Sequence, residues 1–333
     1  MFPERILASR KRMGLFSVTW LGIVTCSLVL VCNASSRAED ADAPRSKWTT
    51  SVGVEEGYTS NVRWAGTGSE KESAYFTTVE GAFGRKARGK RDHLSHLGLK
   101  VRGRFYDRFS ERDFVEIRPD AIYRLGDTEF LLRYAYVPRK LELDDPVTGN
   151  VHKSVHAVET GVQRKFGPGK AFRVRALVET EWERSKTDFD DRDAFTIGGS
   201  VELRYRMHEL FTPRVALGYG ERDANNENFD REERELVVGF DSHWTDRVYS
   251  RVRFKRANRK YTVAAPVGPS GSNNNFQRED DINQVEAGMI VECARVPHLS
   301  FDAGYKYRDS QSTRTSRTFD VHEAGVGVTY RFR

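Results

Sequence analysis

The sequence predicts an all-β protein, a single antiparallel sheet of about fourteen strands closed into a barrel. Three observations predict this fold. Apolar and polar residues alternate over runs of more than ten residues, the connections between the runs are alternately long and short, and the number of runs is even. An even number lets the first and last strands of a closed antiparallel sheet pair with each other, which leaves no open edge.

The composition fits a chain with two kinds of surface. Hydrophobic residues make up only 38% of the 333 residues, whereas 20 Phe, 13 Tyr and 5 Trp bring the aromatic fraction to 11%. So many aromatic residues argue against disorder. Only one uninterrupted apolar run is present, which excludes a bundle of membrane-spanning helices. Few hydrophobic residues beside many aromatics are expected where one face of each strand meets lipid and the other meets water.

The N-terminal region is typical of a targeting segment. Four basic residues between positions 5 and 12 precede an apolar run at residues 14–32, and the small residues Ser36 and Ala38 follow. This order predicts a secretory signal peptide cleaved near Ala38. An uncleaved anchor is the alternative, because 19 residues can just span a bilayer.

Loss of this segment changes the charge of the chain. Residues 1–38 contain five of the 54 basic side chains and one of the 48 acidic ones, so the net charge falls from +6 to +2. A nearly neutral chain lacks the electrostatic footprint of a nucleic-acid-binding protein, and no nucleic-acid partner is expected. Cys293 is the one cysteine left, so neither a disulfide framework nor a thiolate metal site is expected.

The predicted strands are long and two-faced. In residues 171–183, Phe172 and Val174 lie on one face of the strand, and Arg173 and Arg175 lie on the other. Residues 96–106 and 194–207 repeat this alternation. Strands of a soluble sandwich typically have about five or six residues. Runs of more than ten residues suit tilted membrane-spanning strands of about 9–11 residues.

In chain order, the fourteen predicted strands lie near residues 48–58, 73–85, 94–107, 113–125, 129–142, 153–166, 171–186, 194–208, 213–222, 233–244, 248–261, 282–295, 299–309 and 319–332. The long connections are 59–72, 108–112, 143–152, 187–193, 223–232, 262–281 and 310–318. The short connections are 126–128, 167–170, 209–212, 245–247 and 296–298, and residues 86–93 break the pattern because they are no shorter than the neighbouring long connection 108–112. Long loops at one end and tight turns at the other are typical of an outer-membrane barrel with both termini in the periplasm.

These patterns divide the chain into three parts. We expect residues 1–38 to be a cleaved signal peptide, residues 39–47 a short periplasmic segment, and residues 48–333 the barrel. Proline removes a donor from the strand ladder, so we expect Pro119, Pro138 and Pro213 at rims or bulges.

One face of the predicted strands is rich in charge. The basic residues are Lys100, Arg102, Arg104, Arg173, Arg175, Arg204, Arg206, Arg251, Arg253 and Lys255, and the acidic ones are Glu179, Glu181, Glu183, Glu202, Glu286, Glu292 and Glu323. Rings of such residues around a water-filled lumen would set ion selectivity. The alternative is a solvated wall whose opposite charges pair between neighbouring strands. About fourteen strands enclose more space than side chains fill, and only loop 262–281 is long enough to fold inward.

Aromatic residues fall towards the strand ends or on the apolar faces. They are Tyr58, Trp64, Phe105, Trp182, Tyr205, Tyr219, Trp244, Tyr249, Tyr305 and Tyr307. Interfacial girdles are their expected role. A stacking platform for sugars is the alternative.

Catalytic and metal-binding patterns are weak. The sequence contains neither HExxH nor GxSxG, and the acid-rich loops at 188–193 and 223–233 have no EF-hand register. Outer-membrane hydrolases assemble His with Asp or Ser from different strands, and His152 and His156 near Asp144 and Asp145 form the one group of that kind. We therefore expect no enzyme, no metal and no cofactor.

Two short segments resemble known outer-membrane proteins. Val326, Val328, Tyr330 and Phe332 alternate at the C-terminus and resemble the signal read by the barrel assembly machinery, although Arg333 follows the final aromatic. Residues 57–62, Gly-Tyr-Thr-Ser-Asn-Val, resemble a motif of an outer-membrane β-barrel porin family. Some of those porins are found with exopolysaccharide machinery, and a similar motif opens the barrel of surface-lipoprotein assembly modifiers.

Three hypotheses follow for the function. The first is a passive or weakly selective pore that aids exopolysaccharide export. The second is a barrel that handles surface partners in lipoprotein assembly or adhesion without conducting. The third is a membrane-embedded hydrolase. The resemblance implies outer-membrane lipid, lipopolysaccharide and the assembly machinery as partners in a Gram-negative envelope, and leaves the oligomeric state open.

Overall fold

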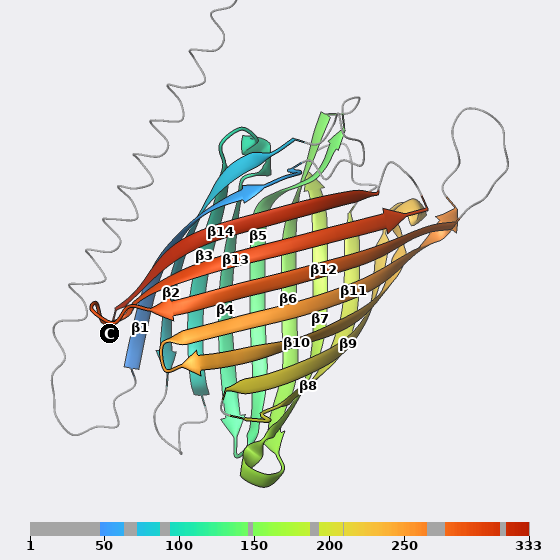
Figure 1. Ribbon diagram of the computed structural model, residues 1–333. Coiled ribbons are helices and arrows are strands. Elements are labelled where there is room, and N and C mark those ends of the chain that lie inside the picture. The colour runs from blue at the N-terminus through green and yellow to red at the C-terminus, as the bar shows by residue number, and fades with distance from the viewer. Residues whose placement is uncertain are drawn as a thin grey trace, which may run out of the picture. The chain divides into compact units, whose positions relative to one another are not determined.

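Fourteen strands form one closed antiparallel barrel in a computed structural model (Figure 1), which confirms the predicted fold and strand number. The structure describes residues 47–62, 72–86, 94–145, 149–186, 193–208, 210–264, 277–313 and 318–332. Each strand pairs with its neighbours in the sequence, and the first pairs with the last. The predicted signal peptide and most of the predicted periplasmic segment lie outside the described residues. Among the described residues, no helix has the length and apolar character needed to cross a membrane.

The strands are β1 (Lys47–Thr59), β2 (Ala74–Lys86), β3 (Leu94–Tyr106), β4 (Phe114–Leu125), β5 (Thr128–Asp145), β6 (Gly149–Phe166), β7 (Phe172–Lys186), β8 (Ala194–Tyr205), β9 (Phe211–Ala224), β10 (Arg231–Thr245), β11 (Val248–Ala264), β12 (Gln277–Glu292), β13 (Leu299–Ser312) and β14 (Phe319–Phe332). Short 3-10 helices, η1 (Ser110–Arg112), η2 (Pro168–Lys170) and η4 (Glu227–Phe229), lie in the connections.

Strands β5 and β6 are longer than the alternation predicts. Their pairing continues to Asp145 and Gly149, so most of the predicted loop 143–152 is strand. Likewise, β11 reaches Ala264 and β12 begins at Gln277. The middle of loop 262–281, the candidate plug, lies outside the described residues. These strands continue through polar residues because the hydrogen bonds between strands are made by the backbone. The pattern of apolar and polar side chains therefore does not show where a strand ends.

The apolar face of the strands points outward. Trp244, Leu217 and Val326 on this face are each 64% exposed. On the opposite face, Glu202, Asp241 and other charged residues are nearly buried. An apolar exposed exterior around a polar interior is the reverse of a soluble protein and is what a bilayer requires of a spanning barrel.

Ion pairs between strands that are not neighbours in the sheet show which face is concave. Arg104 on β3 lies 3.8 Å from Glu323 on β14, with β1 and β2 between them. Arg222 on β9 and Glu183 on β7 are 2.5 Å apart across β8. Side chains of non-adjacent strands converge in this way only inside a curved sheet, so the charged face is the inner face.

The three prolines interrupt the ladder in different ways. Pro138 coincides with a register shift between Val137 and Lys140, which confirms the predicted bulge. Pro213 lies near the start of β9, beyond the last residue of that strand that pairs with β8. Pro119 was expected at a rim or bulge and lies at neither. It sits in the middle of β4, where pairing with β5 lapses between the pairs Ile117–Tyr136 and Asp120–Arg133, because proline has no N–H to donate.

One end of the barrel carries tight turns, and we name it the turn end; the other is the loop end. Gly126 and Asp127 connect β4 to β5, and Gly126 has a φ of +60°, which glycine adopts without steric cost. The side chain of Lys170 in the next turn bonds to Asp127. This bond lowers the pKa of Asp127 below its usual value. Neighbouring turns are therefore tied together.

Candidate functional site: the charged lumen wall

The charged residues singled out from the sequence lie mostly on the inner face. By their register they face inward from five strands: Lys100, Arg102 and Arg104 on β3; Arg173, Arg175, Glu179 and Glu181 on β7; Glu202 and Arg204 on β8; Arg251, Arg253 and Lys255 on β11; and Glu286 and Glu292 on β12. Arg206 is the exception. It follows the end of β8, and its guanidinium donates to the carbonyl of Gly169 in a turn.

Arginines crowd the inner wall of β7–β11 near the turn end. We name this set the arginine belt: Arg173, Arg175, Arg204, Arg214, Arg251 and Arg253. Glu202 lies among them on β8. It accepts from Arg204 Nε at 2.6 Å and from Arg214 Nη2 at 2.6 Å, while Arg175 Nε is 3.8 Å away.

Asp241 on β10 is the second carboxylate of the belt. Its Oδ1 accepts from Arg251 Nε at 2.8 Å and from the hydroxyl of Tyr249 at 2.8 Å, and Arg204 is 3.9 Å from Oδ2. Tyr249 was expected in an interfacial girdle, and that prediction is wrong. The register of β11 with β10 and β12 puts Tyr249 on the same face as Arg251.

The belt has more cations than anions. Among the described residues on the inner face of β7–β11 near the turn end, six arginines face two carboxylates, Glu202 and Asp241. Arg214 was missed by the sequence analysis. The alternation contains its signal, since Arg214 and Arg222 fall on the same face of residues 213–222, opposite Val215 and Leu217.

Acidic side chains gather farther along the same wall. Glu159, Glu179, Glu181, Glu233 and Glu235 line a cavity of about 400 Å³, together with Arg222, Arg231 and Lys255. We name this the acidic chamber. Lys255 Nζ bonds to Glu235 Oε2 at 2.5 Å. Going from the turn end towards the loop end, the wall thus changes from basic to acidic.

A buried charge triad adjoins the chamber, and its member Arg222 also lines the chamber. Glu183 on β7 accepts from Lys153 on β6 and from Arg222 on β9, each at 2.5 Å. All three side chains are at most 8% exposed. Arg259 and Glu233 form a further pair at 2.7 Å. Each of these charges has an opposite charge in direct contact, as burial demands.

On the β1–β4 wall the ladder charges also have partners. Lys100 lies 2.6 Å from Glu80, and Arg102 lies 4.0 Å from Glu55. Arg118 on β4 bonds to Glu116 at 2.6 Å. Arg104 lies near Glu323 and also stacks over the ring of Phe76, 4.1 Å from its centroid. Each of these cations therefore has a carboxylate within 4.0 Å, although the Nε of Arg102 makes no hydrogen bond to the described residues.

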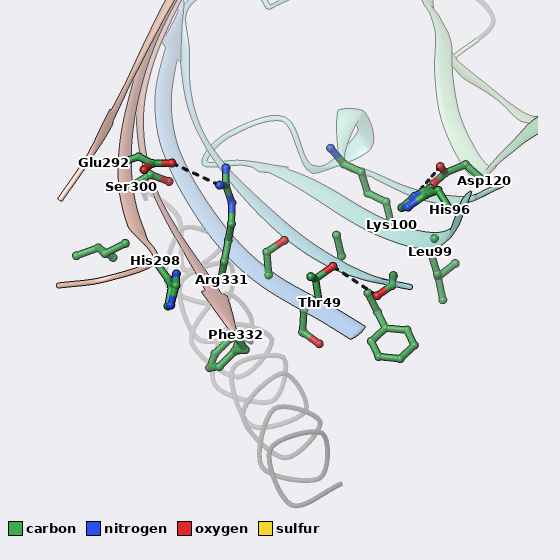
Figure 2. A pocket seen from close by; sticks show the side chains of 17 residues that line it. Thr49, His96, Leu99, Lys100, Asp120, Glu292, His298, Ser300, Arg331 and Phe332 are labelled. Atoms are coloured by element: carbon green, nitrogen blue, oxygen red, sulfur yellow. Dashed lines mark hydrogen bonds and ion pairs between the residues drawn. The ribbon is translucent and has the colours of Figure 1, made fainter. Parts of the chain in front are cut away.

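A cavity of about 590 Å³ opens at the turn end between β1–β4 and β13–β14. His96 Nε2 lies 3.0 Å from Asp120, and Arg331 lies 3.6 Å from Glu292 (Figure 2). Phe332 also lines it. Val326, Val328 and Tyr330, the other residues of the expected assembly signal, point outward at the end of β14, and the rings of Tyr330 and Phe332 are 4.7 Å apart.

The histidines considered for catalysis have separate surroundings. His156 pairs with Tyr136 on the outer face of the barrel, and the two rings are tilted with their centroids 4.6 Å apart. His156 also shares a 2.7 Å hydrogen bond with Tyr134. His152 contacts Arg139 and the carbonyl of Glu111. The side chains of Asp144 and Asp145 lie outside the described residues. Within the described ranges, no group of His, Cys, Asp or Glu has the geometry of a metal site.

The motif at residues 57–62 closes the barrel seam. Ser60 N donates to the carbonyl of His322 at 2.9 Å, and His322 N donates to Ser60 Oγ at 2.9 Å. Asn61 is fully buried and donates to the carbonyl of Asp320. Gly57 is required because the ring of Phe76 lies where a Cβ would be, 2.3 Å away. The motif therefore fastens β1 to β14.

No protein-family model matches the sequence. The chain is 26% identical over 157 residues to the opacity protein opA66 of Neisseria gonorrhoeae, a match that covers 44% of this chain and 58% of that protein. The chain therefore matches little more than half the length of this curated relative.

The solved structures that align with this chain include outer-membrane proteins. OmpT, an outer membrane protein of Vibrio cholerae, aligns with a TM-score of 0.48 at 11% identity, covering 89% of this chain and all of that chain. The outer membrane channel DcaP of Acinetobacter baumannii aligns with a TM-score of 0.47 at 11% identity, covering 89% and 99%. An anion-selective porin from Comamonas acidovorans aligns with a TM-score of 0.45 at 7% identity, covering 86% and 99%.

Proposed function

We propose that this protein is an outer-membrane pore for the passive or weakly selective passage of small polar solutes. The arginine belt carries this proposal: an inner wall with six arginines and two carboxylates lies in a closed barrel whose exterior is apolar. Uncompensated charge requires water or a polar solute beside it, because burying it in a dry interior is unfavourable.

The outer face supports the membrane location. Its apolar residues are exposed along β7–β10, as Val201, Leu217 and Val238 illustrate. We assign the turn end to the periplasm, since the strands at both termini end there. Outer-membrane lipid and lipopolysaccharide would contact the apolar band, and the assembly machinery would read Val326, Val328, Tyr330 and Phe332.

Exported exopolysaccharide is a candidate cargo within this proposal. It is supported by the resemblance of residues 57–62 to a motif of porins found with exopolysaccharide machinery. In this protein the motif closes the seam between β1 and β14. Its resemblance therefore supports a shared way of closing the barrel more directly than it supports exopolysaccharide as the transported molecule.

Planar-bilayer recording of the refolded protein tests the proposal. Stepwise conductance in KCl is the expected result, and a heat-denatured sample of the same preparation serves as control. Absence of steps in any salt would overturn the pore.

One observation favours a second candidate, a barrel that handles surface partners without conducting. The triad of Lys153, Glu183 and Arg222 is buried and fully paired near the loop end. Interlocked charges of this kind fill space and reduce the opening. A barrel without conductance that still binds cell-surface proteins or lipoproteins in a pull-down would support this candidate.

A further inference from the structure

We propose that the arginine belt is a binding site for an oxyanion, a carboxylate or phosphate group of the solute that enters the lumen. The proposal rests on the proposed function, since a solute reaches the belt through the pore. The donors for such a ligand are guanidinium N–H groups of the belt that have no acceptor among the described residues.

Several N–H groups of the belt make no hydrogen bond to the described residues. They are Nε and Nη1 of Arg214, Nε of Arg175 and Nε of Arg253. Arg214 is the most constrained, because its side chain is only 9% exposed and Nη2 alone is used, by Glu202. Buried polar groups are almost always hydrogen-bonded, so buried donors without acceptors indicate a missing partner.

The charges around these donors favour an anion as that partner. Arg214 experiences the repulsion of Arg204 and Arg253, and Arg253 experiences that of Arg251 and Arg204. Glu202 and Asp241 offset two of the six positive charges, and Glu286 on β12 faces Arg253 from the adjacent strand. Even with Glu286 counted, positive charge remains. Electrostatic attraction is stronger in such a partly desolvated site than in water.

The donor geometry selects among anions. Arginine presents planar, forked N–H groups that match two oxygens of a carboxylate or phosphate, which a spherical halide does not exploit. Arg204 and Arg214 already bind Glu202 from two strands, each through one N–H group and each at a different carboxylate oxygen. A solute oxyanion would take the free edges of Arg175, Arg214 and Arg253, on strands β7, β9 and β11.

Other charged parts of the lumen lack this surplus of positive charge. Arg102 on β3 also has a buried Nε without a hydrogen-bond partner, but Glu55 lies 4.0 Å from its guanidinium. Arg118 on β4 bonds to Glu116 at 2.6 Å, and Lys100 on β3 bonds to Glu80 at 2.6 Å. In the acidic chamber, carboxylates outnumber cations. An entering oxyanion is therefore attracted to the belt and repelled by the chamber on the same wall.

The test is calorimetric titration of inorganic phosphate into the detergent-solubilised barrel at low ionic strength, paired with bilayer recording. We expect one phosphate per barrel. Arg175→Gln and Arg214→Gln should each weaken binding about tenfold or more, because each removes charged hydrogen bonds. Glu202→Gln should tighten it several-fold by removing a competing carboxylate. Arg118→Gln is the matched control, an inward arginine on the opposite wall, and should bind like the wild type.

The outcomes separate the site from the pore. Conductance without phosphate binding, or an equal loss of binding in Arg118→Gln, would overturn the oxyanion site and leave the pore standing. Phosphate binding that depends on Arg175 without any conductance would overturn the pore and leave the site. If Arg214→Gln fails to fold, Arg175→Gln carries the test, since Arg175 is 25% exposed and more tolerant of change.

Discussion

The two walls of the barrel use the same residue types in opposite ways. On β1–β4, Lys100 and Arg118 each have a carboxylate within 2.6 Å. On β7–β11, Glu202 alone has three arginines around it, and donors of Arg214 are left over. Pairing between neighbouring charges stabilises a wall, whereas unpaired charge of one sign creates a field in the lumen. The first wall therefore carries nearly balanced charge, and the second carries the positive surplus that we propose attracts solutes.

The largest expected effect is on ion preference. Replacing Arg251, Arg253 and Lys255 by Glu reverses the charge of the solute-facing wall and should move the reversal potential in a KCl gradient strongly towards cation selectivity. The same triple replacement of Lys100, Arg102 and Arg104 on the paired wall is the comparison, and its shift should be smaller. Equal shifts would show that the two walls do not differ, and an unchanged reversal potential would refute a lumen role for the belt strands.

The next effect is on stability. Glu183→Gln removes the negative member of a buried triad and leaves Lys153 and Arg222 facing each other with little solvent, so it should lower the free energy of unfolding by about 3 kcal/mol. Urea unfolding in micelles measures it. Glu80→Gln on the paired wall is the control; it breaks a pair that is a third or more exposed and should change stability by less than about 1 kcal/mol. If Glu80→Gln lowered the free energy of unfolding as much as Glu183→Gln does, burial of the triad would not explain its contribution to stability.

The seam provides a third test. Asn61→Ala removes the buried hydrogen bond to the carbonyl of Asp320 and should destabilise the barrel by about 1–2 kcal/mol in the same unfolding assay. Thr77→Ala, which removes an exposed bond to Glu56, should have almost no effect. If the two variants behave alike, the seam motif is not what fastens β1 to β14.

The smallest effect concerns pH at the loop end of the paired wall. Asp113 follows η1, and desolvation raises its pKa from 3.8 to about 6 although its carboxylate accepts from Tyr106 N at 2.8 Å. The folded loop therefore holds the proton more tightly than the unfolded chain, so its stability is greatest below pH 4 and declines as the pH rises through 6. The hydrogen-exchange protection factor of the Tyr106 amide should fall over this range. In Asp113→Asn this protection factor should not change with pH. A decline of the same size in that variant would mean that another group causes the pH dependence.

Alternation along the chain was enough to predict the barrel. Each strand has its own inside and outside because side chains alternate, so residues such as Phe172 and Arg173 could be assigned to opposite faces without knowing any partner. The same local rule predicted the number of strands and the two kinds of connection. Applied to residues 249–255, the rule also places Tyr249 beside Arg251 on the inner face, so the girdle expectation departed from the alternation and was wrong. The rule does not report the ladder gap at Pro119, which depends on β5.

The pairing of charges depended on the tertiary structure. Arg104 and Glu323 lie 219 positions apart in the sequence and meet because the closed, curved sheet brings β3 and β14 together across two strands. Arg214 gains its surplus donors only because Arg204 already occupies Glu202 from the neighbouring strand. The sequence alone determined which side chains face the lumen, since that follows from a two-residue period. Which of them neutralise each other and which stay available to a solute was decided by register and curvature, because ion pairing depends on distances between strands far apart in the chain.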